Sequence, residues 1–141
     1  MTKTRWLIAG AVAAIIVPMA ACAPPPTAGG GPDPKLVQGS WTLVWWSDSG
    51  PLPTEPITMQ VEDARISGNV CNNYNGPVEI NDSTFRVGLL ATTMMLCAED
   101  LDQAERTYHF LLSSINGWSV ENGKLSLTTG GIEHLRFEKA S

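Results

Sequence analysis

Apolar and polar residues alternate along most of the chain from residue 40 onward. The alternation occurs in short runs at residues 40–46, 57–62, 84–87, 118–121, 124–127 and 134–138. A two-residue period predicts strands that bury one face. In the first run it places Trp41, Leu43 and Trp45 toward the core. Val44 and Trp46 are then expected on the opposite face, because successive side chains of a strand alternate.

Residues 98–115 follow a helical period instead. Their apolar side chains fall on one stripe, made of Leu101, Ala104, Tyr108, Leu111, Leu112 and Ile115. Asn122-Gly123, which lies between two alternating runs, predicts a type I′ hairpin turn. The pattern therefore predicts a mainly β (α+β) domain. We expect a small antiparallel, barrel-like sheet of about seven to eight strands with one amphipathic helix packed on it.

The first 21 residues have the pattern of a cleaved signal peptide. Lys3 and Arg5 precede the apolar run Trp6–Val17, whose twelve residues are too few to span a bilayer. Small residues then lead to Cys22 in the sequence Met-Ala-Ala-Cys, which resembles a bacterial lipobox. We therefore expect a lipid on Cys22 that anchors the protein to the cell membrane, facing the extracytoplasmic side. The alternative is an ordinary signal peptide that leaves Cys22 as a free thiol.

Residues 22–35 form the expected lipidated cysteine and a Pro/Gly-rich tether. Ala23–Pro34 contains five prolines and three glycines, a composition that cannot build a core. The folded domain is therefore expected over residues 36–141. Cleavage before Cys22 removes two basic residues and changes the net charge from −5 to −7. Such an acidic chain has no electrostatic footprint for nucleic acid.

Five segments carry motifs that occur together in one family of bacterial proteins. They are Gly39–Val44, Gly68–Gly76 (GNVCNNYNG), Thr93–Cys97 (TMMLC), Leu125–Leu127 and Leu135–Phe137. On these motifs, residues 39–138 resemble the META domain family, the HslJ-like envelope proteins. The resemblance implies a compact, β-barrel-like fold and an envelope location, and members are associated with stress tolerance. Val70 and Met94 stand where a glycine and a basic residue are common, which puts any family ligand site at Met94 in doubt here.

Cys71 and Cys97 are the two cysteines that remain once Cys22 is acylated. An exported domain lies where disulfides persist, so we expect a bond between Cys71 and Cys97. In the chain-entropy model, closing this loop of about 26 residues adds about 3.5 kcal/mol of stability. The alternative is a pair of buried free thiols that pack as small apolar groups.

A possible interaction surface is made of Trp46, Asn72, Asn73 and Tyr74. Exposed aromatic residues such as Trp46 are enriched at interfaces, although the tether or the Pro51–Pro56 loop could instead cover this side chain. The asparagines either bind a polar ligand such as a glycan or serve turns, because Asn tolerates a left-handed backbone. The segment Met94–Leu96 either extends an apolar surface or lies under the helix.

The titratable residues fit no catalytic or metal-binding motif. Glu99, Asp100, Asp102 and Glu105 lack the spacing and the glycine of an EF-hand, and are expected to form a solvated start of the helix. His109 and His134 form no H-E-x-x-H pair, and both are expected at the surface. The sequence also has no G-x-S-x-G and no phosphate-binding loop. We therefore expect no enzyme activity, no metal and no cofactor.

Together these features predict a non-catalytic, lipid-anchored envelope protein that acts in interaction or stress tolerance. Its expected partners are the membrane, through the lipid, and a protein of the envelope. Two alternatives stay open. One is an inhibitor of an envelope protease. The other is a lipocalin-like carrier of an apolar ligand, which needs a cavity, whereas four tryptophans after residue 22 favour a filled core.

Overall fold

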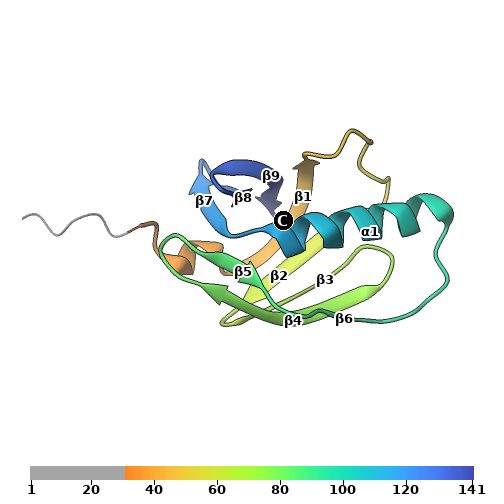
Figure 1. Ribbon diagram of the computed structural model, residues 1–141, viewed down its shortest axis with the longest axis horizontal. Helices are drawn as coiled ribbons and strands as arrows, with labels where there is room; N and C mark the ends of the chain where they lie inside the picture. The colour runs from red at the N-terminus through yellow and green to blue at the C-terminus, as the bar shows by residue number, and fades with distance from the viewer. Residues whose placement is uncertain (1–30) are drawn as a thin grey trace, which may run out of the picture.

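The computed structural model describes residues 31–141 (Figure 1). The predicted signal peptide (residues 1–21), Cys22 and most of the predicted tether lie outside the described residues. The elements in chain order are η1 (Pro34–Val37, a 3-10 helix), β1 (Gly39–Trp46), β2 (Thr58–Glu62), β3 (Arg65–Asn69), β4 (Asn73–Ile80), β5 (Phe85–Val87), β6 (Ala91–Thr92), α1 (Glu99–Ser114), β7 (Gly117–Glu121), β8 (Lys124–Thr129) and β9 (Ile132–Lys139). The first ordered element thus begins two residues before the predicted start of the domain.

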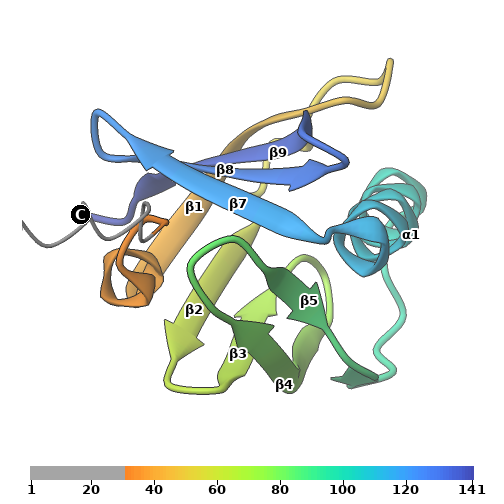
Figure 2. The ribbon, with the colours of Figure 1, turned by 60° about the vertical axis from the view of Figure 1, so that its left-hand side comes forward.

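The strands form one antiparallel sheet that curls into a nearly closed barrel (Figure 2). Eight strands follow one another in the order β5-β4-β3-β2-β1-β9-β8-β7, and the short β6 pairs with β4. The first long strand and the last are neighbours, since β1 pairs with β9. Between the two edge strands, the Trp118 indole N–H of β7 donates to the Asn81 carbonyl oxygen, at 2.8 Å, in the turn before β5. The predicted mainly β, barrel-like fold is confirmed.

Helix α1 packs across the side of the barrel where the edge strands approach each other. Figure 2 shows it end-on, between strands β7–β9 above and strands β2–β5 below. Its bounds agree with the predicted helix at residues 98–115 to within one residue. Ala104, Tyr108, Leu111 and Leu112 form its buried face, as the apolar stripe predicted. No helix of residues 31–141 is both long enough and apolar enough to cross a membrane.

Large side chains fill the interior of the barrel. The bulkiest fully buried side chains are those of Trp41, Tyr74, Phe85, Tyr108 and Phe137, and Val37 of η1 is buried with them. Helix α1 supplies one of these rings, and β1, β4, β5 and β9 supply the others. The core is therefore shared by helix and sheet, as a two-layer domain requires.

A β-bulge in β1 overturns the predicted facing of two tryptophans. Leu43 pairs with Phe137, but Trp45 pairs with Arg136, so Val44 is an extra residue opposite β9. Because a one-residue shift turns every following side chain to the other face, Trp45 is 39% exposed and Trp46 only 5% exposed. The prediction that Trp45 faces the core and Trp46 faces outward is wrong.

Two turns between strands contain non-glycine residues with a left-handed backbone. Asn122 and Gly123 have φ angles of 51° and 75°, which confirms the predicted hairpin between β7 and β8. Asp63 has a φ of 52° at the turn between β2 and β3. The alternation of apolar and polar residues does not reveal β3, because its Ser, Gly and Asn residues form no apolar pattern. Its partner β4, which begins at Asn73, also lies outside the alternating runs described above.

Candidate functional site

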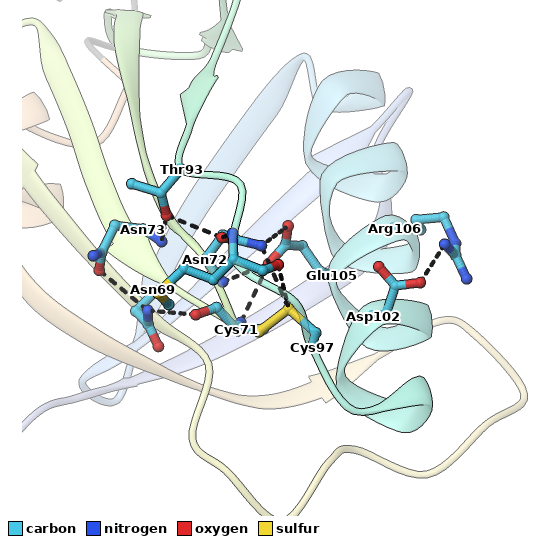
Figure 3. The surroundings of a disulfide bond; sticks show 10 residues. Asn69, Cys71, Asn72, Asn73, Thr93, Cys97, Asp102, Glu105 and Arg106 are labelled. Carbon is cyan, nitrogen blue, oxygen red and sulfur yellow. Dashed lines mark hydrogen bonds and ion pairs between the residues drawn. A yellow bond between two sulfur atoms is a disulfide. The ribbon is translucent and has the colours of Figure 1, made fainter.

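A disulfide bond joins Cys71 to Cys97, as predicted (Figure 3). Cys71 lies in the turn between β3 and β4, and Cys97 lies two residues before α1. The bond therefore fastens the segment between β6 and α1 to the end of a β-hairpin. The sequence separation is 26 residues.

The amide of Asn72 connects the same segment to the helix. Its Oδ1 accepts hydrogen bonds from the Met95 backbone N–H (2.7 Å) and from the Thr93 hydroxyl (3.0 Å). Its Nδ2 donates to Glu105 Oε1, at 3.2 Å, and lies 3.4 Å from Cys97 Sγ. Asn72 is buried, so these bonds compensate for the loss of water around its amide.

The Glu105 carboxylate holds the turn between β3 and β4 against α1. Its Oε2 accepts hydrogen bonds from the backbone N–H groups of Cys71 (3.3 Å) and Asn72 (2.7 Å) (Figure 3). The expectation that Glu105 belongs to a solvated helix start is therefore wrong. One signal was present in the sequence, since Glu105 lies four residues after Leu101 and next to Ala104 of the apolar stripe.

Residues 93–97, which we call the contact loop, are restrained along their length. Thr93 donates its backbone N–H to the Asn73 carbonyl oxygen, and Asn73 donates its own N–H to the Thr93 hydroxyl, both at 3.0 Å. Bonds from Asn72 and the disulfide hold the remainder. Yet the side chains of Met94 and Leu96 are 97% and 103% exposed. Of the two alternatives left open for this segment, the structure shows the apolar surface.

The contact loop lies at the far end of the molecule from η1. Figures 1 and 2 both place η1 at one end of the described chain and the connection from β6 to α1 at the other. Glu99 and Asp100 follow the loop after Ala98 and are exposed. The loop is therefore an apolar tip with an acidic flank, directed away from the N-terminal side of the domain.

Three of the four residues predicted as an interaction surface are buried. Trp46, Asn72 and Tyr74 lie in the interior, and only Asn73 is exposed. The Trp46 indole N–H donates to the Gly50 carbonyl oxygen at 2.9 Å, so the loop after β1 covers this ring. The surface predicted at Trp46, Asn72 and Tyr74 is corrected to an internal role for all three.

Tyr74 and Tyr108 form a buried polar pair across sheet and helix. Their hydroxyl oxygens lie 2.7 Å apart, and the Tyr74 hydroxyl donates to the Thr58 carbonyl oxygen at 2.9 Å. Burial raises the pKa of both phenols. They stay neutral at any physiological pH, and their hydroxyls are paired as buried polar groups require.

His109 is half-buried, which contradicts the expected exposed position. Its ring packs edge-on against Tyr74, with centroids 5.3 Å apart, and also lies near Tyr108. Its Nε2 atom is buried without a hydrogen-bond partner. Burial lowers the pKa of His109 below 6.5, although the charge of Glu105 opposes the change. The neutral imidazole is thus the form that fits this place.

Cys71, Cys97 and Glu105 are the one group of residues in the described part of the chain that could hold a metal ion. Their ligand atoms lie within 4.8 Å of one another. The two sulfurs are bonded to each other, however, and the carboxylate accepts three N–H donors. In this oxidised form the group offers no thiolate to a metal ion, and its role is to hold the turn, the loop and the helix together.

The fold and site define a class of small β-barrel domains with a single helix, in which one disulfide fixes an exposed apolar loop. The chain belongs to the META domain family, whose model matches residues 34–141. Its fold is similar to that of a protein from Burkholderia xenovorans solved by NMR, with a TM-score of 0.63 and 24% identity, covering 83% of this chain and 97% of that one. A second NMR structure is similar with a TM-score of 0.58 and 21% identity, covering 74% and 92%. A comparison with curated proteins found no match.

Proposed function

We propose that this protein is a non-catalytic, lipid-anchored protein of the cell envelope that contacts another envelope protein through the contact loop. The observation that carries the proposal is the combination of restraint and exposure in residues 93–97. The disulfide and the Asn72 bonds stabilise the fold, and they also hold in one place a loop whose Met94 and Leu96 side chains are fully exposed. Fixing the loop in advance lowers the entropy lost when a partner binds.

The chemistry of the loop indicates the partner's surface. Met94 offers a flexible, unbranched side chain that adapts to an irregular apolar cleft, and Leu96 adds a second exposed apolar side chain beside it. The exposed Glu99 and Asp100 beside them favour basic side chains at the rim of that cleft. The same acidic flank disfavours an anionic lipid surface as the occupant of the loop.

The absence of catalysis in this proposal is supported by how the polar groups around the disulfide are used. Both Glu105 oxygens and both polar atoms of the Asn72 amide are engaged in bonds that hold the backbone or the helix. The lipid anchor in the proposal is supported by residues 1–35 of the sequence alone. A role in stress tolerance is supported by the resemblance of the motifs to the HslJ-like envelope proteins.

The two alternative functions are supported unequally. A lipocalin-like carrier needs an internal cavity, and here aromatic rings occupy the barrel interior. A protease inhibitor is favoured by one observation, because a restrained and exposed apolar segment could occupy the substrate cleft of a protease. If the protein inhibits an envelope protease at a one-to-one ratio and Leu96→Ser abolishes the inhibition, then that protease is the partner of the contact loop.

Site-specific photocrosslinking in intact cells tests the proposal. We expect a photoreactive amino acid at position 96 to capture one envelope protein, and the further change Met94→Ser, with the label kept at position 96, to reduce this capture without loss of stability. A photoreactive residue at Ile132, which is also exposed and apolar, is the matched control and should capture nothing comparable. Equal capture from positions 96 and 132 would contradict the proposal.

A further inference from the structure

A groove lies between α1 and the loop of residues 47–57 that joins β1 to β2. Figure 1 shows this loop beside the helix. The volume of the groove is about 360 Å³, within the range of about 300–1,000 Å³ found for small-molecule sites. The buried residues Trp46 and Ala104 form its floor. One wall is apolar and comes from Pro51, Leu52 and Pro53.

The loop wall of the groove is held in place before any ligand arrives. The Trp46 indole N–H donates to the Gly50 carbonyl oxygen, at 2.9 Å, and Gly50 donates its backbone N–H to Asp48 Oδ2, at 3.0 Å. Pro51 and Pro53 further restrict the backbone, because each ring fixes its own φ angle. A preformed wall of this kind lowers the entropy that binding would cost.

The charged residues that line the groove are both acidic. They are Asp48, from the loop, and Asp100, from the first turn of α1. One basic side chain, Arg106, lines the adjoining hollow and is already paired with Asp102 at 2.5 Å. Gln103 and Thr107 add hydrogen-bonding groups along the helix wall. The groove therefore combines an apolar floor with a negative rim.

We propose that this groove binds small organic amines, with the apolar part of the ligand against Trp46 and Leu52 and the ammonium group near Asp48 and Asp100. An ammonium group is complementary to two carboxylates, and a carboxylate ligand of the same shape is repelled by them. The groove shares Asp100 with the acidic flank of the contact loop, but none of residues 93–97 lines it, so amine binding can hold or fail independently of the proposed function.

Three probes of the same shape and different charge test the inference. They are phenethylamine, phenylethanol and phenylpropionate, each titrated at about pH 7, where the first probe is a cation, the second is neutral and the third is an anion. The protein is the chain from residue 22 with Cys22→Ser, which keeps every residue of the described core, since that core begins at Val37. Binding is followed through the NMR signals of the Trp46 indole N–H and the backbone amides of residues 103–107.

We expect saturable shifts of these signals with phenethylamine, weaker shifts with phenylethanol and none with phenylpropionate. The double variant Asp48→Asn, Asp100→Asn should weaken amine binding about 3- to 10-fold, the effect of removing two exposed ion pairs. Asparagine keeps an oxygen that can accept the Gly50 N–H, so the loop is preserved. The matched control is Glu62→Gln, Glu79→Gln, which makes the same charge change at exposed residues that do not line the groove.

A filling variant provides a second line of evidence. Gln103 is exposed on the helix wall, so Gln103→Trp should occupy the groove and abolish the shifts while the barrel stays folded. The inference is overturned by equal binding of the three probes, by shifts that map elsewhere, or by equal weakening in the control pair. It is also overturned if Gln103→Trp leaves amine binding unchanged.

Discussion

Asn72 shows how much of this site depends on a single buried amide. It bonds the contact loop through Met95 and the helix through Glu105, and it lies beside one half of the disulfide. A sequence of four nearby asparagines does not reveal which of them is buried. The distinction arises because β3 ends at Asn69 and β4 begins at Asn73, so that residue 72 lies in the turn between them and is turned inward beneath the contact loop.

Replacing this amide should destabilise the domain. We expect Asn72→Ala to lower the free energy of unfolding by about 2–3 kcal/mol, because the Met95 N–H loses its acceptor and Glu105 loses a donor, both in a partly buried place. Urea denaturation measures the change. Asn73→Ala, at an exposed neighbour, should cost less than about 1 kcal/mol. Equal losses from the two variants would show that the Asn72 network is not the cause.

His109 should make stability depend on pH below about 6.5. Burial lowers its pKa in the folded state, while Glu105 opposes that effect, and the rings of Tyr74 and Tyr108 face it. At a pH between the two pKa values, the unfolded chain binds a proton that the folded chain does not. Stability is therefore complete above pH 6.5 and falls as the pH drops through the unfolded-state pKa.

The measurement is the midpoint of urea denaturation at about pH 8 and about pH 5. Because glutamine does not titrate, His109→Gln should lose less stability between about pH 8 and about pH 5 than the unaltered protein does. Glu133, whose pKa is lowered by its hydrogen bond to Arg136, contributes at a lower pH, where that carboxylate becomes protonated. An unchanged pH profile in His109→Gln would mean that the imidazole does not govern it.

At the scale of elements, the sequence predicted those parts of the fold in which local and tertiary preferences agree. The helix at 99–114 and the Asn122-Gly123 turn were both predicted, because periodicity and turn chemistry specify them locally. The bulge at Val44 was not, since it is set by pairing with β9, about 90 residues further along the chain. The strand β3 is polar, and its place depends on the neighbours between which it pairs.

The candidate site likewise contains one feature that the sequence predicted and one that it did not. The disulfide could be predicted from the number of cysteines and the expected compartment. The role of Glu105 could not, because an acidic residue in the first turns of a helix is ordinarily solvated. Only the tertiary position of the β3–β4 turn brings two backbone N–H groups to that carboxylate.

Removing the disulfide should free one end of the contact loop. We expect Cys71→Ala together with Cys97→Ala to lower the free energy of unfolding by about 3.5 kcal/mol, the chain-entropy value for a 26-residue separation. Denaturation with and without a reducing agent measures it. The reductant should destabilise the unaltered protein by a similar amount and leave the double variant unchanged. A double variant that still responds to reductant would contradict this assignment.

At the scale of the whole molecule, the domain has two distinct ends. Its described chain begins near η1, and the contact loop lies at the opposite end (Figure 1). A lipid on Cys22 would therefore hold the domain by the end that is remote from the apolar tip. In that arrangement the tip lies at the end of the domain opposite the attachment, where a partner can reach it.

The anchor itself can be tested by fractionation of cells. We expect Cys22→Ala to move the protein from the membrane to the soluble extracytoplasmic fraction, because two acyl chains are what make such anchoring stable. The Cys71→Ala, Cys97→Ala variant retains Cys22 and should remain in the membrane fraction. Membrane retention of Cys22→Ala would favour attachment by a route other than this lipid.

The pairing of β1 with β9 has a consequence for the predicted export of the chain. In the export that the N-terminal segment predicts, β1 emerges early, and its partner strand emerges only when almost the whole domain has crossed. Contacts so distant in sequence also form slowly. The sheet therefore cannot be completed while the chain is crossing the membrane. The polypeptide stays unfolded enough for translocation until β9, its last strand, has crossed.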